Sequence, residues 1–372
     1  MSPPPFHLGA LQAYLEHRLG TAATVEEVRQ LGGEASGPDA LKQFGYGRPL
    51  LVTYRAGDSR RQEVFHSIRR TGFGRERDDD RMAAVWLDFQ TFNRLPRHVS
   101  AVDMVGLSRD GELSSLHDLG ELLLVTTYQP GALYAADLLR LRDGGELQQD
   151  DLVRAEALAT YLAQIHSQRH EGSPDLRGML WRRRLRDLLG HGEGIMGLAD
   201  SYPMPLPYVE RQQLQELETL ANDWRWRLKP LDRLLCQVHG DFHPFNIVFD
   251  PEGAFHVLDR SRGAWGAAAD DVSCLSINYL FFSLQRSGQF AGPFVALYRR
   301  FWQTYLAQRH GQMLLTTIQP WYAWRALVLA SPIWYPDIDE RIRRRMLTFA
   351  RQVMLAERFA WDEVAQYLEG AR

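Results

Sequence analysis

Lysine is almost absent from this chain. Among its 43 basic residues only Lys42 and Lys229 are lysines, and the rest are arginines. Codon bias in a GC-rich genome is a sufficient cause, but the scarcity makes each lysine a residue to examine. Cysteine is equally scarce, because Cys236 and Cys274 are the only two, and both lie in apolar segments. A disulfide-stabilised scaffold is therefore not expected, and a reduced cytosolic setting fits.

Several other features are missing. The 372 residues carry a formal net charge of −3, so no nucleic-acid-binding footprint is evident. The first residues have neither the basic region nor the apolar stretch of a signal peptide. The apolar residues 321–336 are too few for a membrane span and include Arg325. We expect a cytoplasmic protein with one large or two moderate domains and no nucleic-acid or membrane partner, and the sequence does not predict its oligomeric state.

The most informative stretch is His-Gly-Asp-Phe-His-Pro-Phe-Asn at residues 239–246, with Asp259 thirteen residues later. It places one carboxylate, Asp241, in a tight turn and an amide, Asn246, five residues on. A second carboxylate then ends the next apolar run. Phosphoryl transfer from a nucleotide needs one carboxylate to orient a hydroxyl and accept its proton. It also needs an amide oxygen and a second carboxylate to hold Mg²⁺.

The segments around this motif predict short strands. Residues 234–238, 246–249 and 255–258 are apolar, and the turn between the last two contains Pro and Gly. A hairpin built from these two strands would return Asp259 to the neighbourhood of Asn246. Two oxygen ligands would then converge from adjacent strand ends, as a hard cation requires.

The pattern His-Gly-Asp-x-His-x-x-Asn, followed by an apolar strand that ends in Asp, resembles the aminoglycoside phosphotransferase and choline kinase family. These are small-molecule kinases of the protein-kinase-like fold. The resemblance implies that Asp241 is the catalytic base and that Asn246 and Asp259 are the Mg²⁺ ligands. His239 would be a structural residue of the catalytic loop, and Asp271 the family's structural carboxylate near it.

The same resemblance implies an α+β, bilobal protein-kinase-like fold, with a small β-rich N-lobe and a larger, mainly helical C-lobe. The implied reaction is transfer of the γ-phosphoryl group of ATP or GTP to a hydroxyl of a small molecule, such as an aminoglycoside, choline or a sugar.

Two residues depart from the family pattern. Phe245 stands where the family often has Gly, and Arg260 where Trp or Phe is common.

A rival interpretation takes His239, Asp241 and His243, which alternate along an extended segment, as ligands for Zn²⁺. That interpretation leaves the amide and the second carboxylate of the motif unexplained.

The N-terminal part is expected to bind the nucleotide. Residues 8–19 predict a helix, residues 25–31 a strand, and residues 32–37 a Gly-rich turn. Such a turn lets backbone N–H groups approach phosphates without Cβ clashes. The candidate phosphate-binding residues there are Gly33, Ser36 and Gly37.

Further strands and a helix are expected downstream. Residues 50–68 predict a hairpin, residues 78–93 a helix, and residues 121–128 a strand. This order resembles the N-lobe of the family. Thr126, Thr127 and Tyr128 would then be hinge residues whose backbone groups face the adenine.

The family's phosphate-binding Lys should lie near residues 64–69, and no Lys is there. Three interpretations stay open. Lys42 reaches the phosphates from a shifted site, or Arg69 replaces the lysine although a guanidinium is not equivalent to an ammonium. Alternatively nucleotide binding is weak, and the chain is a non-catalytic kinase-like binding module. Candidate carboxylate partners for the cation are Asp78, Asp79, Asp80 and Asp88, although such a run more often forms a solvated face.

We expect an N-lobe over residues 1–128 and a C-lobe over residues 129–372. The C-lobe begins with an amphipathic helix over residues 151–169, in which His166 is a packed helix-end residue. A loop-rich insertion over residues 172–205 and a helix over residues 208–228 follow. Beyond Asp271, helices are expected at residues 272–287, 290–309, 314–330, 337–358 and 361–370.

Aromatic residues gather near carboxylates late in the chain. The aromatics are Trp321, Tyr322, Trp324, Trp334 and Tyr335, and the carboxylates are Asp337, Asp339 and Glu340. Such a group can hold a cationic substrate. Aromatics at helical spacing more often form a core, and the core interpretation is favoured, with the cation site as the alternative.

Overall fold

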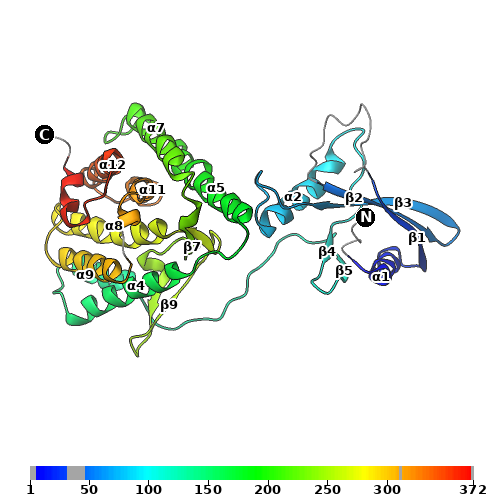
Figure 1. Cartoon of the computed structure of the whole chain (residues 1–372), viewed down its shortest axis with the longest axis horizontal. Coiled ribbons are helices and arrows are strands. Elements are labelled where there is room, and N and C mark those ends of the chain that lie inside the picture. Colours follow the sequence, from blue (N-terminus) through cyan, green and yellow to red (C-terminus); the bar gives the residue numbers. More distant parts are fainter. Residues whose placement is uncertain (1–5, 32–46, 310–311, 370–372) are drawn as a thin grey trace. The chain divides into compact units, whose positions relative to one another are not determined.

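The computed structural model describes residues 6–31, 47–309 and 312–369. The chain divides into two compact units, Met1–Thr126 and Thr127–Arg372. Both are mixtures of helices and small antiparallel sheets, which confirms the α+β class (Figure 1). None of the helices in these residues is long and apolar enough to span a membrane.

The first unit is built on a three-stranded antiparallel sheet in the order β1-β2-β3. Its elements are α1 (Leu8–Leu19), β1 (Ala23–Gln30), β2 (Gly47–Ala56), β3 (Ser59–Ile68), α2 (Asp78–Thr91), the 3-10 turn η1 (Phe92–Arg94), β4 (Val105–Leu107) and β5 (Leu113–Ser115). Its core joins Leu11 and Leu15 of α1 to Val52 and Tyr54 of β2. The predicted first helix, first strand, hairpin and second helix are therefore confirmed.

The strand predicted over residues 121–128 is wrong. These residues form no helix or strand in the structure. Leu124 and Val125 are each 90% exposed. An apolar run indicates burial, but a strand also needs a neighbouring edge with free N–H and C=O groups. No described strand pairs with this run.

The second unit is mainly helical. Its elements are β6 (Ala132–Leu133), α3 (Tyr134–Arg142), α4 (Gln149–Ser167), α5 (Pro174–Gly190), α6 (Ile195–Ser201), α7 (Arg211–Leu228), η2 (Asp232–Leu234), β7 (Leu235–Gln237), η3 (Pro244–Asn246), β8 (Ile247–Phe249), β9 (Phe255–Val257), β10 (Trp265–Ala267), α8 (Ala268–Ser287), α9 (Pro293–Gln308), α10 (Gln312–Leu315), α11 (Gln319–Ala330), α12 (Glu340–Leu355) and η4 (Trp361–Leu368).

Helix α8 is the centre of this unit. Every residue from Ala269 to Leu284 is buried. The helix contacts α3, α9, α11 and α12, and the large apolar core of the unit surrounds it (Figure 1). A helix that is buried all round holds a fixed position, so the side chains of its first turn are well placed to fix a loop.

The loop-rich insertion expected over residues 172–205 is also wrong, because α5 and α6 occupy most of it. The Ser173 hydroxyl accepts the N–H of Leu176, and Pro174 lies in the first turn, so this is a capped helix start. Trp181 is buried and donates its indole N–H to the Leu228 carbonyl at 2.8 Å. The segment is therefore part of the core.

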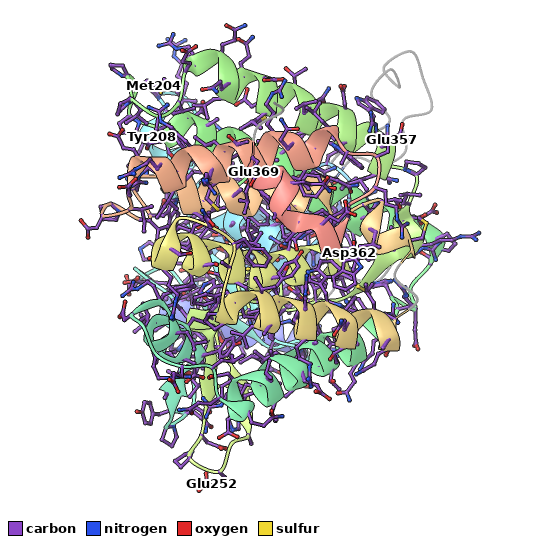
Figure 2. The ribbon with its side chains drawn as sticks, turned by 90° about the vertical axis from the view of Figure 1, so that its left-hand side faces the viewer. Met204, Tyr208, Glu252, Glu357, Asp362 and Glu369 are labelled. Atoms are coloured by element: carbon purple, nitrogen blue, oxygen red, sulfur yellow. The ribbon has the colours of Figure 1, made fainter. Side chains whose placement is uncertain are left out.

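Two small sheets frame the sequence motif. Strand β7 pairs antiparallel with β10, and β8 pairs with both β6 and β9. The motif thus links β7 to β8, and the β8–β9 hairpin leads back to Asp259, as predicted. Glu252 lies at the outer tip of the turn in this hairpin (Figure 2). Helix α3 and strand β10 were not predicted, and the helix expected over residues 314–330 is divided into α10 and α11.

Candidate active site

Asp271, in the first turn of α8, fixes the loop that follows β7. Its carboxylate accepts the N–H groups of His239 at 2.8 Å and of Gly240 at 2.7 Å. Its Oδ2 also lies 3.1 Å from Nε2 of His166, whose Nδ1 contacts the Tyr305 hydroxyl. All of these polar groups are buried. Asp271 therefore holds the loop, as the family resemblance implies, and His166 is a packed residue.

The electrostatics of Asp271 follow from these contacts. Burial alone would raise its pKa, but hydrogen bonds from His166 and from the two backbone N–H groups outweigh burial and lower the pKa. The position near the N-terminus of α8 favours the ionised form as well.

His239 cannot be a zinc ligand in this geometry. Its Nδ1 accepts the N–H of Asp241 at 3.2 Å, and its Nε2 donates to the Leu258 carbonyl at 2.8 Å. A histidine binds a metal through a ring nitrogen that has a free lone pair. Among the described residues, no group of three His, Cys, Asp or Glu side chains is arranged to hold a metal. The zinc interpretation is therefore wrong.

The two oxygens of Asp241 have different surroundings. Oδ1 accepts from Arg262 Nη1 and from Arg325 Nη1, each at 2.7 Å. Oδ2 lies 3.7 Å from Nε2 of His243. Since Nδ1 of His243 accepts the N–H of Phe245, the proton of the neutral ring is on Nε2. Oδ1 is thus fixed, and Oδ2 is the oxygen that can accept from a hydroxyl.

The same arginines set the charge of this group. Burial would raise the pKa of Asp241, but the guanidiniums of Arg325 and Arg262 outweigh burial and hold the pKa well below its usual range. Burial and the two arginines lower the pKa of His243, although Asp241 opposes them. Near neutral pH the site therefore has an ionised Asp241 beside a neutral His243.

Arg325 connects the loop to three helices. Its Nη2 donates to Asp270 Oδ1 at 2.7 Å and to the Gly240 carbonyl at 3.1 Å. Asp270 is fully buried at the start of α8 and also pairs with Arg184 of α5. The loop, α5, α8 and α11 are thus joined by one charged network, which the sequence interpretation did not include. An arginine inside an apolar stretch was the available signal, because a buried cation requires an anionic partner.

Trp324 of α11 supports the two arginines that bind Asp241. The Arg325 and Arg262 Cζ atoms lie 4.0 and 4.9 Å from its ring centroid. Trp321 and Tyr322 are buried in the core. The core interpretation of the aromatic cluster is therefore confirmed for these three residues, and the face of Trp324 is occupied by the protein's own cations.

Asn246 is positioned with its amide nitrogen engaged. Nδ2 donates to the Asp241 carbonyl at 3.1 Å, which leaves Oδ1 as a ligand atom. The Asn246 carbonyl accepts the N–H of Leu258 at 2.8 Å, so the hairpin register brings the residue before Asp259 beside Asn246. Both residues thus stand at the same end of adjacent strands, as the sequence predicts.

Asp259 itself has an unusual backbone. Its φ is +51°, in the left-handed region that few non-glycine residues adopt. Strained conformations of this kind cluster at functional sites. The Asp259 side chain is exposed, so its carboxylate can reach an ion in the solvent-facing space beside Asn246.

The two departures from the family pattern differ in effect. Arg260 donates from Nε and Nη2 to the Val238 carbonyl at 3.0 and 2.7 Å, and so ties β9 to the end of β7. Phe245 is 39% exposed, and its ring centroid lies 6.0 Å from that of His243.

Most of the nucleotide-binding predictions remain predictions. Gly33, Ser36, Gly37 and Lys42 lie outside the described residues. Arg69 directly follows β3 and is exposed. Thr127 and Tyr128 are exposed and belong to no helix or strand. The structure therefore brings together Asp241, Asn246 and the chain leading to Asp259, and it does not bring the other candidates to them.

The acidic run at the start of α2 has local partners. Asp80 accepts the N–H of Arg77 at 2.8 Å and thereby caps the helix. Asp78 pairs with Arg70 and Arg81 on the surface. The solvated-face interpretation thus fits Asp78 and Asp79, whereas the Asp80 side chain is only 8% exposed.

A profile of the phosphotransferase enzyme family (APH) matches residues 54–310, which include the whole motif. The chain belongs to this family. The resemblance seen at residues 239–259 is thereby confirmed. A search of curated protein sequences finds no match.

Three solved structures illustrate the similarity of this phosphotransferase family member to known proteins. A glucosamine kinase with glucosamine, ADP and inorganic phosphate is 21% identical, with a TM-score of 0.37, over 64% of this chain and 60% of that one. The Plasmodium vivax ethanolamine kinase is 10% identical, with a TM-score of 0.34, over 92% and 80% of the two chains. An amicoumacin kinase is 14% identical, with a TM-score of 0.41, over 91% of each chain.

Proposed function

We propose that this protein transfers the γ-phosphoryl group of ATP or GTP to a hydroxyl group of a small molecule. Membership of the phosphotransferase enzyme family supports transfer of a phosphoryl group. The observation that carries the proposal is the asymmetric setting of Asp241, whose Oδ1 is fixed by two arginines while Oδ2 is left for a hydroxyl. An amide and a second carboxylate stand at the adjacent strand ends.

Asn246 and Asp259 fit a divalent cation. The amide oxygen of Asn246 is left as an acceptor by the engagement of its nitrogen, and Asp259 contributes an exposed carboxylate. Oxygen donors of these types suit Mg²⁺. When bound, the ion would neutralise charge on the phosphates of the nucleotide.

Asp241 orients the acceptor hydroxyl. Its pKa lies below the usual range, so it is a weak base and accepts the proton late. Such timing suits a loose phosphoryl-transfer transition state, in which the nucleophile loses its proton only as the bond to phosphorus forms.

The test is Asp241→Asn, which keeps the shape of the side chain and one oxygen for the arginines. With Mg²⁺, ATP and a library of hydroxyl compounds, turnover should fall by roughly 10²–10⁴-fold, because the hydroxyl loses its acceptor. Nucleotide affinity, measured by calorimetry, should stay within a few-fold of wild type. Asp143→Asn, in an exposed pair with Arg142, is the matched control. An unchanged rate in Asp241→Asn would refute the proposal.

A second candidate is a non-catalytic kinase-like binding module. The observation in its favour is that β3 contains no lysine where the family places its phosphate-binding residue. Thermal shift with ATP, with and without Mg²⁺, separates the two functions. A Mg²⁺-dependent shift together with turnover supports the kinase, and no shift at millimolar nucleotide favours the module.

A further inference from the structure

We infer that the acceptor carries a carboxylate close to the hydroxyl that is phosphorylated, and that this carboxylate replaces Glu193 on Arg262. The inference rests on the proposed phosphotransferase function and adds the chemical class of the acceptor. It follows from the way in which one guanidinium holds two carboxylates beside each other.

Arg262 bridges the catalytic loop and the loop between α5 and α6. Its Nη1 lies 2.7 Å from Asp241 Oδ1, and its Nη2 donates to Glu193 Oε2 at 2.8 Å. The two nitrogens belong to one planar fork, which binds carboxylates in a fixed geometry. The Glu193 carboxylate is therefore bound by the same guanidinium as Asp241, the carboxylate that would orient the acceptor hydroxyl.

Glu193 is suited to leave this position. Its side chain is 49% exposed, whereas that of Asp241 is 14% exposed. An ion pair in contact with water contributes little net stability, so an incoming carboxylate can displace it at small cost. The Glu193 carbonyl accepts the indole N–H of Trp324 at 2.6 Å. The loop thus stays anchored by its backbone while the side chain turns away.

The charge balance favours an anion over a cation. The charged network contains three arginines, Arg184, Arg262 and Arg325, and three carboxylates, those of Asp241, Asp270 and Glu193. Glu193 is the most exposed of the three carboxylates, so an incoming carboxylate that takes its place keeps the charges paired.

A cationic acceptor would find two of the groups around Asp241 already occupied. The face of Trp324 is covered by Arg262 and Arg325. Asp270 is fully buried and paired on both oxygens. The face of Trp324 and the carboxylate of Asp270 are thus used inside the protein.

The spacing indicates a short molecule. The hydroxyl would be at Asp241 Oδ2 and the carboxylate at Arg262 Nη2, so the two groups must be only a few bonds apart. A short-chain hydroxy acid meets this condition.

The experiment is calorimetric titration of the full-length protein with a panel of short-chain hydroxy acids, each paired with its primary amide. 4-Hydroxybutyrate and 4-hydroxybutyramide are one such pair. We expect the best acids to bind about tenfold or more tightly than their amides, because the amide cannot form the charge-assisted pair with Arg262. Equal or weaker binding of acids across the panel would overturn the inference.

Two variants make the test specific. Glu193→Gln should strengthen binding of the acid several-fold, because the competing carboxylate is gone, and Arg262→Gln should abolish the preference for acid over amide. Arg262→Lys keeps the positive charge but loses the planar fork, so it should retain part of the preference for acid over amide. This variant also provides the test if Arg262→Gln does not fold. The control Glu252→Gln, at the exposed tip of the β8–β9 turn (Figure 2), should bind as wild type.

Further measurements show whether the anion on Arg262 comes from the acceptor or from the nucleotide. They also separate a failure of this inference from a failure of the proposed phosphotransferase function. If Glu193→Gln strengthens binding of MgATP and not of the acids, the position belongs to the nucleotide phosphates and the inference is wrong. Turnover of neutral alcohols with no preference for acids contradicts the inference alone. Selective acid binding without any MgATP turnover contradicts the phosphotransferase function and leaves the anion site standing.

Discussion

At the scale of single residues, the site is governed by how buried charges are paired. Asp241, Asp270 and Asp271 lie close together in or beside the first turn of α8, and like charges in one region repel. Each is stabilised by a different kind of donor: arginines for Asp241 and Asp270, and backbone N–H groups with a histidine for Asp271. These separate partners allow Asp241 and Asp271 to stay ionised although a third carboxylate, that of Asp270, lies nearby.

Asp271→Asn should destabilise the protein. The amide keeps one acceptor oxygen, but its NH₂ group then faces a backbone N–H, so a buried donor loses its partner. We expect the free energy of unfolding to fall by about 2–4 kcal/mol, measured by urea denaturation. Asp143→Asn, at an exposed residue that pairs with Arg142, should change the free energy of unfolding by less than about 0.5 kcal/mol. Equal effects of the two substitutions would contradict the anchoring function of Asp271.

The lowered pKa of Asp271 also predicts a pH dependence of stability. A carboxyl whose pKa is lower in the folded state stabilises the fold at every pH above its unfolded value, about 3.9. This contribution declines as the pH falls below that value towards the folded pKa, because the unfolded chain takes up the proton first. Urea midpoints between pH 6 and pH 3 should therefore fall more steeply for wild type than for Asp271→Asn. Parallel curves would exclude this linkage.

At the scale of elements, the sequence predicted what depends on neighbours along the chain. The β2–β3 hairpin, the β8–β9 hairpin and most helices follow from local periodicity and turn residues. The position of Asn246 beside the residue that precedes Asp259 was predictable because a short hairpin joins them. The Gly and Pro residues of the 172–205 region suggested a loop, whereas Ser173 and Pro174 in fact begin a helix.

The rest depends on contacts between distant segments. Arg325 is 84 residues from Asp241 in the sequence, and its partner could not be chosen before the helices were placed. The run Leu122–Val125 is a predicted strand that does not form. Its apolar character favoured a strand, but the described residues provide no strand edge with which it could pair. The run is also exposed, so its apolar composition predicted neither the burial nor the pairing that a strand requires.

Gly131→Ala tests the strand that supports β8. The φ of Gly131 is +149°, and an added Cβ would lie 2.3 Å from the Phe249 carbonyl oxygen. The clash should move β6 away from β8 and lower the free energy of unfolding by about 1–3 kcal/mol. Gly192→Ala, where a Cβ meets nothing within 4 Å, is the matched control. Thermal unfolding of both variants gives the comparison, and a wild-type melting temperature in Gly131→Ala would be inconsistent with this pairing.

At the scale of the whole molecule, the two units have separate hydrophobic cores. The buried residues of the larger core lie between Tyr134 and Leu368, and those of the smaller core lie between Phe6 and Ala56. Each unit is therefore built around its own apolar interior, which is the physical condition for folding alone.

A fragment of residues 127–372 should accordingly fold by itself. We expect a helical circular dichroism spectrum and a single cooperative thermal transition, because the core, α8 and the Asp271 network all lie within it. The fragment with Asp271→Asn should melt at a lower temperature, as in the full chain. A gradual, non-cooperative transition would show that the unit needs residues 1–126.

The occupied Oδ1 of Asp241 has a stereochemical consequence. Only Oδ2 remains for an alcohol, and the arginines prevent the carboxylate from rotating to present its other edge. A polyol would therefore be held by one chosen hydroxyl, and its neighbours would stay out of line with the phosphorus atom. Product analysis should then find a single regioisomer, even from an acceptor with several distinct alcohols of similar reactivity.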